Sequence, residues 1–273
     1  MNQKVESIIL NILTKLAAVL TLGTLIFLIV YILIKGVPYI KPSLFAWEYT
    51  TENVSLTPAL INTIVMTAMS LLFAVPMGIG SAIYLVEYAK RGSKLVEVIR
   101  LTTETLSGIP SIIYGLFGYL FFVTQLHFGY SLLGGAMTLA IMILPLIMRQ
   151  TEESLKSVPD LFREGSFGLG AGKLRTIFSI VLPAAVPGIL AGIILAIGRI
   201  VGETAALIYT SGTVAGIPES IMGSGRTMAI HMYVLTNEGL YTNQSYATAV
   251  VLLIVVCGIN ALSALVAKKL AKS

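Results

Sequence analysis

Apolar residues are concentrated in six long runs, which are separated by segments richer in polar residues, glycine and proline. The runs cover residues 16–34, 60–86, 106–124, 132–148, 184–208 and 247–267. A helix of about 20 apolar residues crosses the roughly 30 Å hydrocarbon core of a bilayer. The pattern therefore predicts six membrane-spanning helices. We expect the first to stay on the chain, because it is too long for a cleavable signal sequence and no small-residue cleavage site follows it.

The composition agrees with a membrane protein. Of the 273 residues, 56% are apolar and 11% are charged, and the mean hydropathy is +0.90. A soluble domain has about a quarter of its residues charged. The chain is therefore interpreted as an all-α polytopic membrane protein. Because no repeat or flexible linker interrupts it, we expect an N-terminal cytoplasmic segment (1–15) followed by one six-span membrane domain (16–273).

The distribution of lysine and arginine predicts the orientation. With the N-terminus inside, the internal segments hold most of these residues, and the external segments hold only Lys35, Lys41 and Arg226. Cytoplasmic loops of membrane proteins carry such an excess. Both termini are therefore expected in the cytoplasm. The formal net charge of +5 follows from this bias and gives no reason to expect nucleic-acid binding.

The sequence lacks the patterns of enzymatic or metal chemistry. The glycine-rich stretch 168–173 is not a Walker phosphate loop, because Phe167 replaces its first glycine and Leu174 replaces its final Ser or Thr. His127 and His231 have no carboxylate or cysteine at metal-ligand spacing and are interpreted as packing or interfacial residues. No nucleophilic-serine motif occurs. We therefore expect no catalytic residue, metal site or cofactor on this chain.

The cytoplasmic segment of about 150–183 carries signals for a helix and a turn. Pro159 and Asp160 favour a helix start, and the glycines between Gly168 and Gly172 favour its end. We predict a short helix, a bend and a second helix that enters the membrane. The apolar side chains of this segment are Leu161, Phe162 and Phe167. They either insert into a groove of a partner or lie on the lipid headgroups.

The same segment resembles the EAA loop of the membrane subunits of ABC importers. Glu164 and two small residues precede Gly170 at the spacing of that loop, and Ile180–Pro183 follow nine residues later. Gly165 and Ser166 stand where alanines are usual. The resemblance implies the six-helix, MetI-like fold of type I importer permeases, with this loop docked on a cytoplasmic ATPase. The docking residues that it implies are Glu164, Gly165, Ser166, Gly170, Leu182 and Pro183.

Residues 105–118 and 198–212 resemble segments of phosphate-specific importers. Among their membrane subunits the chain is similar to the A-type, because the C-type usually has a longer N-terminal region. The resemblance implies inorganic phosphate as the substrate, a sibling C-type subunit and an external phosphate-binding protein. It also implies two cytoplasmic ATPases, which bind ATP and Mg²⁺ and carry out the hydrolysis, and a place in the inner or plasma membrane of a prokaryote.

Arg199 and Glu203 lie inside the fifth predicted span, where an unpaired charge costs about 2.5 to 3.5 kcal/mol on insertion scales. Four residues apart on one helix, they can form an ion pair. We interpret Arg199 as a bidentate ligand for an oxyanion in transit, with Glu203 holding the guanidinium in position. The alternative is a purely structural ion pair. Small residues on the same stripe, namely Gly188, Gly192 and Ala196, allow a neighbouring helix to approach closely. Further hydroxyl donors are predicted at Thr204, Thr210 and Ser211.

Two other functions fit the same residues. One is the same architecture carrying another oxyanion or small solute. The other is a channel or secondary transporter that works without ATP and has no need of the loop around Glu164. The external segment of about 211–245 is rich in glycine, and its part from 226 to 235 is predicted to form a short helix at the outer surface.

Overall fold

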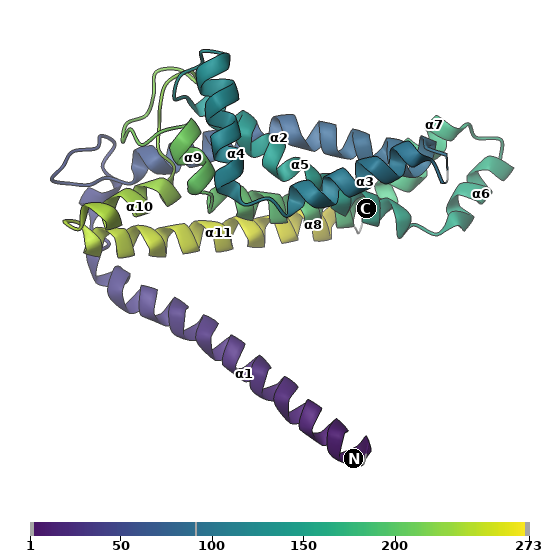
Figure 1. Cartoon of the computed structure of the whole chain (residues 1–273), viewed down its shortest axis with the longest axis horizontal. Helices are drawn as coiled ribbons and strands as arrows, with labels where there is room; N and C mark the ends of the chain where they lie inside the picture. Colours follow the sequence, from purple (N-terminus) through teal and green to yellow (C-terminus); the bar gives the residue numbers. More distant parts are fainter. Residues whose placement is uncertain (1–2, 91, 271–273) are drawn as a thin grey trace.

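The structure is a computed structural model that describes residues 3–90 and 92–270 (Figure 1). Within these residues the chain forms helices and loops, without a strand. Five helical segments are long and apolar enough to cross a bilayer, and a bent pair of helices supplies the sixth span. The prediction of an all-helical, six-span protein is confirmed. The five segments are Ser7–Tyr39, Thr57–Tyr88, Leu132–Lys156, Lys173–Val201 and Thr242–Leu262.

The helix α5 (Leu132–Lys156) lies at the centre of the bundle. Helices α2 (Thr57–Ile83) and α8 (Leu182–Val201) pack on it, and α11 (Thr242–Leu270) packs on α8. Protein rather than lipid covers most of α5, since 67% of its apolar span is buried. Leu139 and Ile143 of α5 join Met66 of α2 and Ala196 of α8 in the main core.

Small residues let α8 lie close to α5, as the sequence predicted. A Cβ atom added to Gly188 would overlap the side chain of Ser154, and one added to Gly192 would overlap Gln150. Ala196 is fully buried. A larger side chain on this stripe would push the two helices apart, because backbone approach requires small residues at the contact.

The third predicted span, 106–124, is not straight. Helix α3 (Lys94–Ser107) and helix α4 (Ser111–Gly118), which continues as the π-helical turn η4 (Tyr119–Gln125), meet at 101°. Proline has no N–H and disfavours the helical conformation of the residue before it, so Pro110 separates the two helices. The Tyr114 hydroxyl donates to the Leu106 carbonyl at 2.7 Å and holds the bend.

The fifth predicted span, 184–208, differs at both ends. It begins earlier, because α7 (Lys173–Thr176) and the π-helical turn η5 (Ile177–Val181) run directly into α8. It also ends earlier, because α8 stops at Val201 and a separate helix, α9 (Ala205–Thr210), follows three residues later. Glycine is a poor helix former, and Gly202 begins this break.

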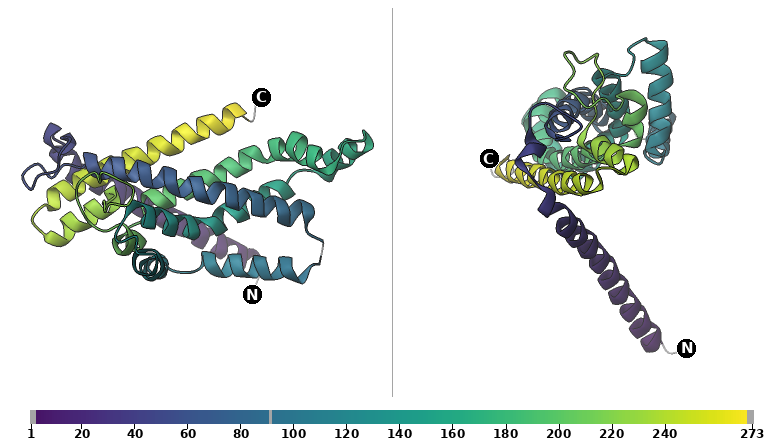
Figure 2. Two further views of the ribbon diagram at one scale, coloured as in Figure 1. Left: turned by 90° about the horizontal axis from the view of Figure 1, so that it is seen from above. Right: turned by 90° about the vertical axis from the view of Figure 1, so that its left-hand side faces the viewer.

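Helix α1 (Gln3–Gly36) diverges from the bundle (Figures 1 and 2). Its C-terminal end packs on α11, where Gly36 adjoins the backbone of Tyr246. The apolar span of α1 is otherwise exposed in this chain. The short helices η1 (Val37–Tyr39) and η2 (Pro42–Phe45) follow it.

The two ends of the bundle carry different elements (Figure 1). Helix α6 (Asp160–Gly168) and α7 form one end, while α9, α10 (Met228–Glu238) and the loops around them form the other. The helix predicted over 226–235 is thus present as α10. One face of α10 packs into the protein, where Met228, Ile230 and Leu235 are fully buried, while Tyr233 is exposed.

Candidate functional site

The break between α8 and α9 changes the role expected of Glu203. One oxygen of its carboxylate, Oε1, accepts hydrogen bonds from the backbone N–H groups of Thr204 and Ala206, both at 3.1 Å. The side chain is buried and stabilises the first turn of α9, whose N–H groups have no partner within that helix. Within the described residues Glu203 forms no ion pair with Arg199. The predicted i,i+4 pair is therefore wrong, because that spacing brings side chains together only on an unbroken helix.

Arg199 lies in the last turn of α8 and is partly exposed. Its guanidinium makes no hydrogen bond or ion pair with the described residues. A cation in the last turn interacts favourably with the helix dipole. The planar fork of Arg199 thus has donors available beside the break in the helix.

The hydroxyl groups predicted near Arg199 are not equivalent. Thr210 and Ser211 are fully buried. The Thr210 hydroxyl donates to the Ala206 carbonyl at 2.9 Å, and the Ser211 hydroxyl donates to the carbonyl of Gly225. Their hydrogens are therefore engaged within the chain. Thr204, which is partly exposed in the break itself, is the hydroxyl nearest in sequence to both charged residues.

At the other end of the bundle, α6 ends as the glycine pattern predicts. Gly170 has φ +82°, a conformation that strains any residue with a Cβ atom. The Gly170 N–H donates to the Phe167 carbonyl at 2.9 Å, and the Ala171 N–H donates to the Ser166 carbonyl at 3.1 Å. This pair of bonds is a Schellman motif, which closes the helix and turns the chain toward α7.

The residues predicted to dock on an ATPase divide between two faces of this end. Ser166 points inward and shares a 2.8 Å hydrogen bond with Thr176 of α7. Glu164 and Gly165 are exposed on α6, and Leu182 and Pro183 lie farther along, at the start of α8. Large apolar side chains surround the exposed face. These are Leu161, Phe162, Phe167 and Leu169, of which Leu169 is 91% exposed.

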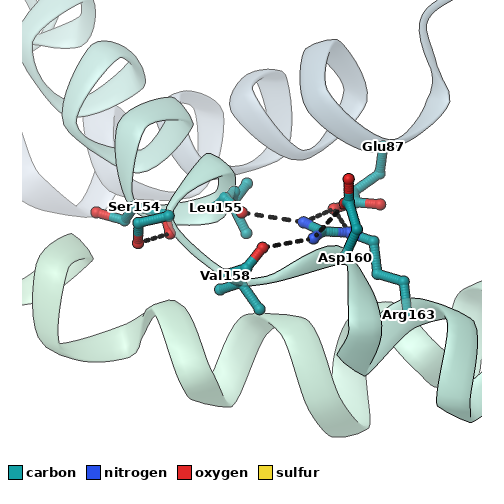
Figure 3. Close-up of polar contacts among 7 residues, drawn as sticks. Glu87, Ser154, Leu155, Val158, Asp160 and Arg163 are labelled. Carbon is teal, nitrogen blue, oxygen red and sulfur yellow. Dashed lines mark hydrogen bonds and ion pairs between the residues drawn. The ribbon is translucent and has the colours of Figure 1, made fainter.

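An ion pair that no sequence pattern predicted joins α6 to the end of α2. Arg163 of α6 reaches Glu87, which lies in the π-helical turn η3 (Tyr84–Tyr88) at the end of α2, with 2.8 Å between Nη2 and Oε1 (Figure 3). The partners are 76 positions apart in the chain. Neither residue belongs to a sequence motif that predicts the other as its partner.

A second unexpected cluster surrounds Arg226 near α10. Arg226 is 3% exposed, and its guanidinium stacks on the Tyr49 ring at 4.6 Å. Its Nε and Nη2 atoms are buried without a hydrogen-bond partner in the described residues. The His231 ring also packs edge-on against Tyr49, with 6.1 Å between the two ring centroids. Arg226, which was used above only to predict the orientation, is thus a buried cation in the folded chain.

The pKa of His231 is lowered to about 3, first by its burial and then by the charge of Arg226, while the nearby Val54 carbonyl acts in the opposite direction. At pH values between 6.5, the pKa of His231 in the unfolded chain, and about 3, its pKa in the folded chain, the unfolded chain binds a proton that the folded chain does not. The free energy of unfolding should therefore fall by about 2 kcal/mol from pH 7.5 to pH 5 through this group. The free energy of unfolding can be measured in detergent at both pH values. The difference between them should be lost in His231→Asn and kept in His127→Asn, because His127 is exposed.

Comparison with known proteins identifies the family. Residues 74–272 match the family described as "Binding-protein-dependent transport system inner membrane component". This match includes the α6 turn and the break between α8 and α9. The chain belongs to this family. The protein is thus an inner-membrane permease component of a transport system and not an enzyme.

Curated relatives of the permease are similar along most of their length. The probable ABC transporter permease protein YqgI of Bacillus subtilis is 32% identical over 88% of this chain and 86% of its own. The phosphate transport system permease protein PstA of Yersinia pestis is 40% identical over 72% of this chain and 70% of its own. The phosphate transport system permease protein PstA 1 of Mycobacterium tuberculosis is 37% identical over 76% of this chain and 68% of its own.

Solved structures show the same fold at low sequence identity. A chain of a bacterial alginate ABC transporter, in complex with an alginate-bound periplasmic protein, has a TM-score of 0.65 at 16% identity and covers 95% of the permease and 96% of itself. A chain of the MetNI methionine ABC transporter, in inward-facing form, has a TM-score of 0.61 at 19% identity, with 79% and 94% covered. The MetI-like permease fold implied by the EAA resemblance is confirmed.

Proposed function

We infer that the permease is the A-type membrane subunit of an ATP-driven importer of inorganic phosphate. The observation that carries this inference is the unpaired fork of Arg199 beside a break in a membrane helix, in a chain whose relatives include phosphate transport permeases. Irregular backbone at membrane depth is tolerated where protein buries it or where it lines a water-filled path. The break at Gly202–Thr204 therefore suits a route for a hydrated anion.

In this function Arg199 binds the anion and Glu203 shapes the site. Arginine is charged at every working pH and offers two parallel donors to a phosphate. Glu203 keeps the start of α9 in place through the Thr204 and Ala206 N–H groups, and its negative charge partly compensates Arg199 when the path is empty. Thr204 is positioned to add a hydroxyl donor. A structural ion pair does not explain Arg199, since its predicted partner bonds elsewhere.

The exposed face of α6 is the proposed docking surface for the ATPase. Leu161, Phe162 and Leu169 are 77%, 53% and 91% exposed, and apolar side chains on a short helix suit a hydrophobic groove. Glu164 supplies a charged contact beside them. The complete importer would contain a sibling C-type permease, two ATPases that bind ATP and Mg²⁺, and an external phosphate-binding protein. The α6 end and both termini would face the cytoplasm.

The anion specificity can be tested with the permease purified together with its accompanying subunits. In proteoliposomes that contain the binding protein, phosphate should raise ATP hydrolysis and sulfate or molybdate should not. Stimulation by another anion instead of phosphate would support the rival solute. Phosphate uptake without ATP would support a channel or secondary transporter.

The orientation has its own test, on a Cys257→Ser background because the native cysteine is exposed. Cysteines introduced at Ser43 or Gln244 should react with an impermeant thiol reagent added outside intact cells. A cysteine at Ser93 should react only after permeabilisation, because the positive-inside bias places it in the cytoplasm. The opposite labelling pattern would invert the topology.

A further inference from the structure

We propose that Arg163 is a positioning residue that fastens the docking helix α6 to the ends of α2 and α5, so that a movement of the ATPase is passed to the membrane helices. This inference rests on the proposed docking of α6. It concerns the connection behind the docking face rather than the face itself. It assigns Glu87 and Arg163 a role in coupling ATP hydrolysis to transport.

Arg163 binds four groups around its guanidinium, one each in η3, α5, the loop after α5 and α6 itself (Figure 3). Its Nε and Nη2 atoms donate to Glu87 Oε1 at 3.1 and 2.8 Å. Nη2 also donates to the Leu155 carbonyl at 2.9 Å, in the last turn of α5. Nη1 donates to the Val158 carbonyl at 2.8 Å and to Asp160 Oδ1 at 3.2 Å. Such a set requires the planar fork of arginine, because an ammonium cannot reach all of these acceptors at once.

Burial distinguishes this contact from an ordinary surface ion pair. The side chains of Arg163 and Glu87 are 14% and 8% exposed, whereas Arg149 and Glu153, an i,i+4 pair on α5, are 56% and 57% exposed. Exposed pairs contribute little, because water and salt screen them. A buried pair with its remaining donors satisfied is held far more tightly, and removal of one partner leaves the other charge stranded.

The other contacts of α6 lead in a different direction. Ser166 binds Thr176 of α7, and α6 packs on α7 and η5, which continue into α8. Among the described residues, the hydrogen bonds of Arg163 to Glu87 are the polar connection between α6 and α2. Arg163 therefore joins the docking helix to η3 at the end of α2, in addition to the connection that α7 and η5 make with α8.

The elements that Arg163 holds are positioned to carry a displacement onward. Glu87 lies in a π-helical turn, in which the Ala89 N–H donates to the Tyr84 carbonyl at 2.9 Å, and π-helical turns occur frequently at functional sites. Directly behind it, Leu85 of η3 and Leu155 of α5 pack in one buried cluster. The helices α2 and α5 continue from there into the main core, which includes Leu207 of α9. Coupling between distant sites travels through such contiguous packing.

Glu87→Gln tests the inference in the complete importer, reconstituted with the binding protein. Glutamine keeps an acceptor oxygen but removes the charge, and a charge-assisted hydrogen bond is roughly twice as strong as a neutral one. The ATPase should still copurify with the permease and hydrolyse ATP. Phosphate uptake per ATP hydrolysed should fall about tenfold, which is a typical coupling between two sites. Glu153→Gln, the same change in the exposed pair on α5, should behave as the native permease.

Arg163→Lys provides a second variant, because it retains the charge and loses the fork. It should also lower uptake per ATP while the ATPase remains bound. If both variants couple hydrolysis to uptake as the native importer does, the inference is overturned. It is equally overturned if uptake and hydrolysis fall together in proportion to lost complex, since the pair is then only structural. A native complex without phosphate-stimulated hydrolysis would instead overturn the proposed function itself.

Discussion

Arg199→Lys should abolish most phosphate uptake while the permease still folds and assembles. The substitution keeps the positive charge at the end of α8, so the interaction with the helix dipole is retained. It removes the planar pair of donors that binds an oxyanion bidentately. Loss of such a charge-assisted contact is expected to lower uptake by about tenfold or more. The measurement is phosphate uptake in proteoliposomes, normalised to the amount of assembled complex.

Controls separate a substrate ligand from a structural cation. Arg149→Lys, at an exposed position of α5, should have no effect. Arg199→Met combined with Glu203→Gln removes both charges and leaves a glutamine oxygen to accept the N–H groups of Thr204 and Ala206. This double variant should assemble and fail to transport. Normal uptake by an assembled double variant would show that neither charge serves the anion.

Gly170→Val should have the second large effect, at the docking end. The backbone of Gly170 has φ +82°, and an L-residue pays about 1 to 2 kcal/mol in the left-handed region, with more for a β-branched side chain. The Schellman turn after α6 should therefore open and move the docking face. Uptake should fall strongly while insertion into the membrane is unchanged, and the ATPase should copurify poorly.

Gly168→Ala is the matched control for this turn. Gly168 has no atom within 4 Å of an added Cβ and no positive φ, so alanine fits and slightly favours the helix. This variant should transport normally. If Gly170→Val also transports normally with the ATPase bound, the docking role of the α6 turn is wrong.

The sequence predicted those features that depend on local composition. The long apolar runs are helical, although two of them are divided between two helices, because a bilayer-spanning segment must satisfy its backbone hydrogen bonds internally. The start of α6 at Asp160 and its end before Gly170 followed from residue preferences that act within one turn. Gly188 and Gly192 predicted the close approach of a neighbouring helix, which in the structure is α5. The importer family was recognised from the motif spacing around Glu164 and Gly170, and contact of this loop with an ATPase is implied by the resemblance alone.

The tertiary structure decided which side chains meet. Arg199 and Glu203 have the spacing of a helical pair, yet the break at Gly202 directs Glu203 to the N–H groups of α9. The sequence predicted one span over 106–124, whereas the structure has a bend of 101° within it. Arg163 and Glu87, and likewise Arg226 and Tyr49, are distant in the chain and come together only by packing.

The sequence by itself therefore determined the number of spans, the membrane class and the turn after α6, because hydrophobicity and turn preferences act over a few residues. Only the tertiary structure decided the environment of each charge. Whether a buried charge is paired, capped or left with free donors depends on groups from other helices, and no periodicity along one chain specifies those partners.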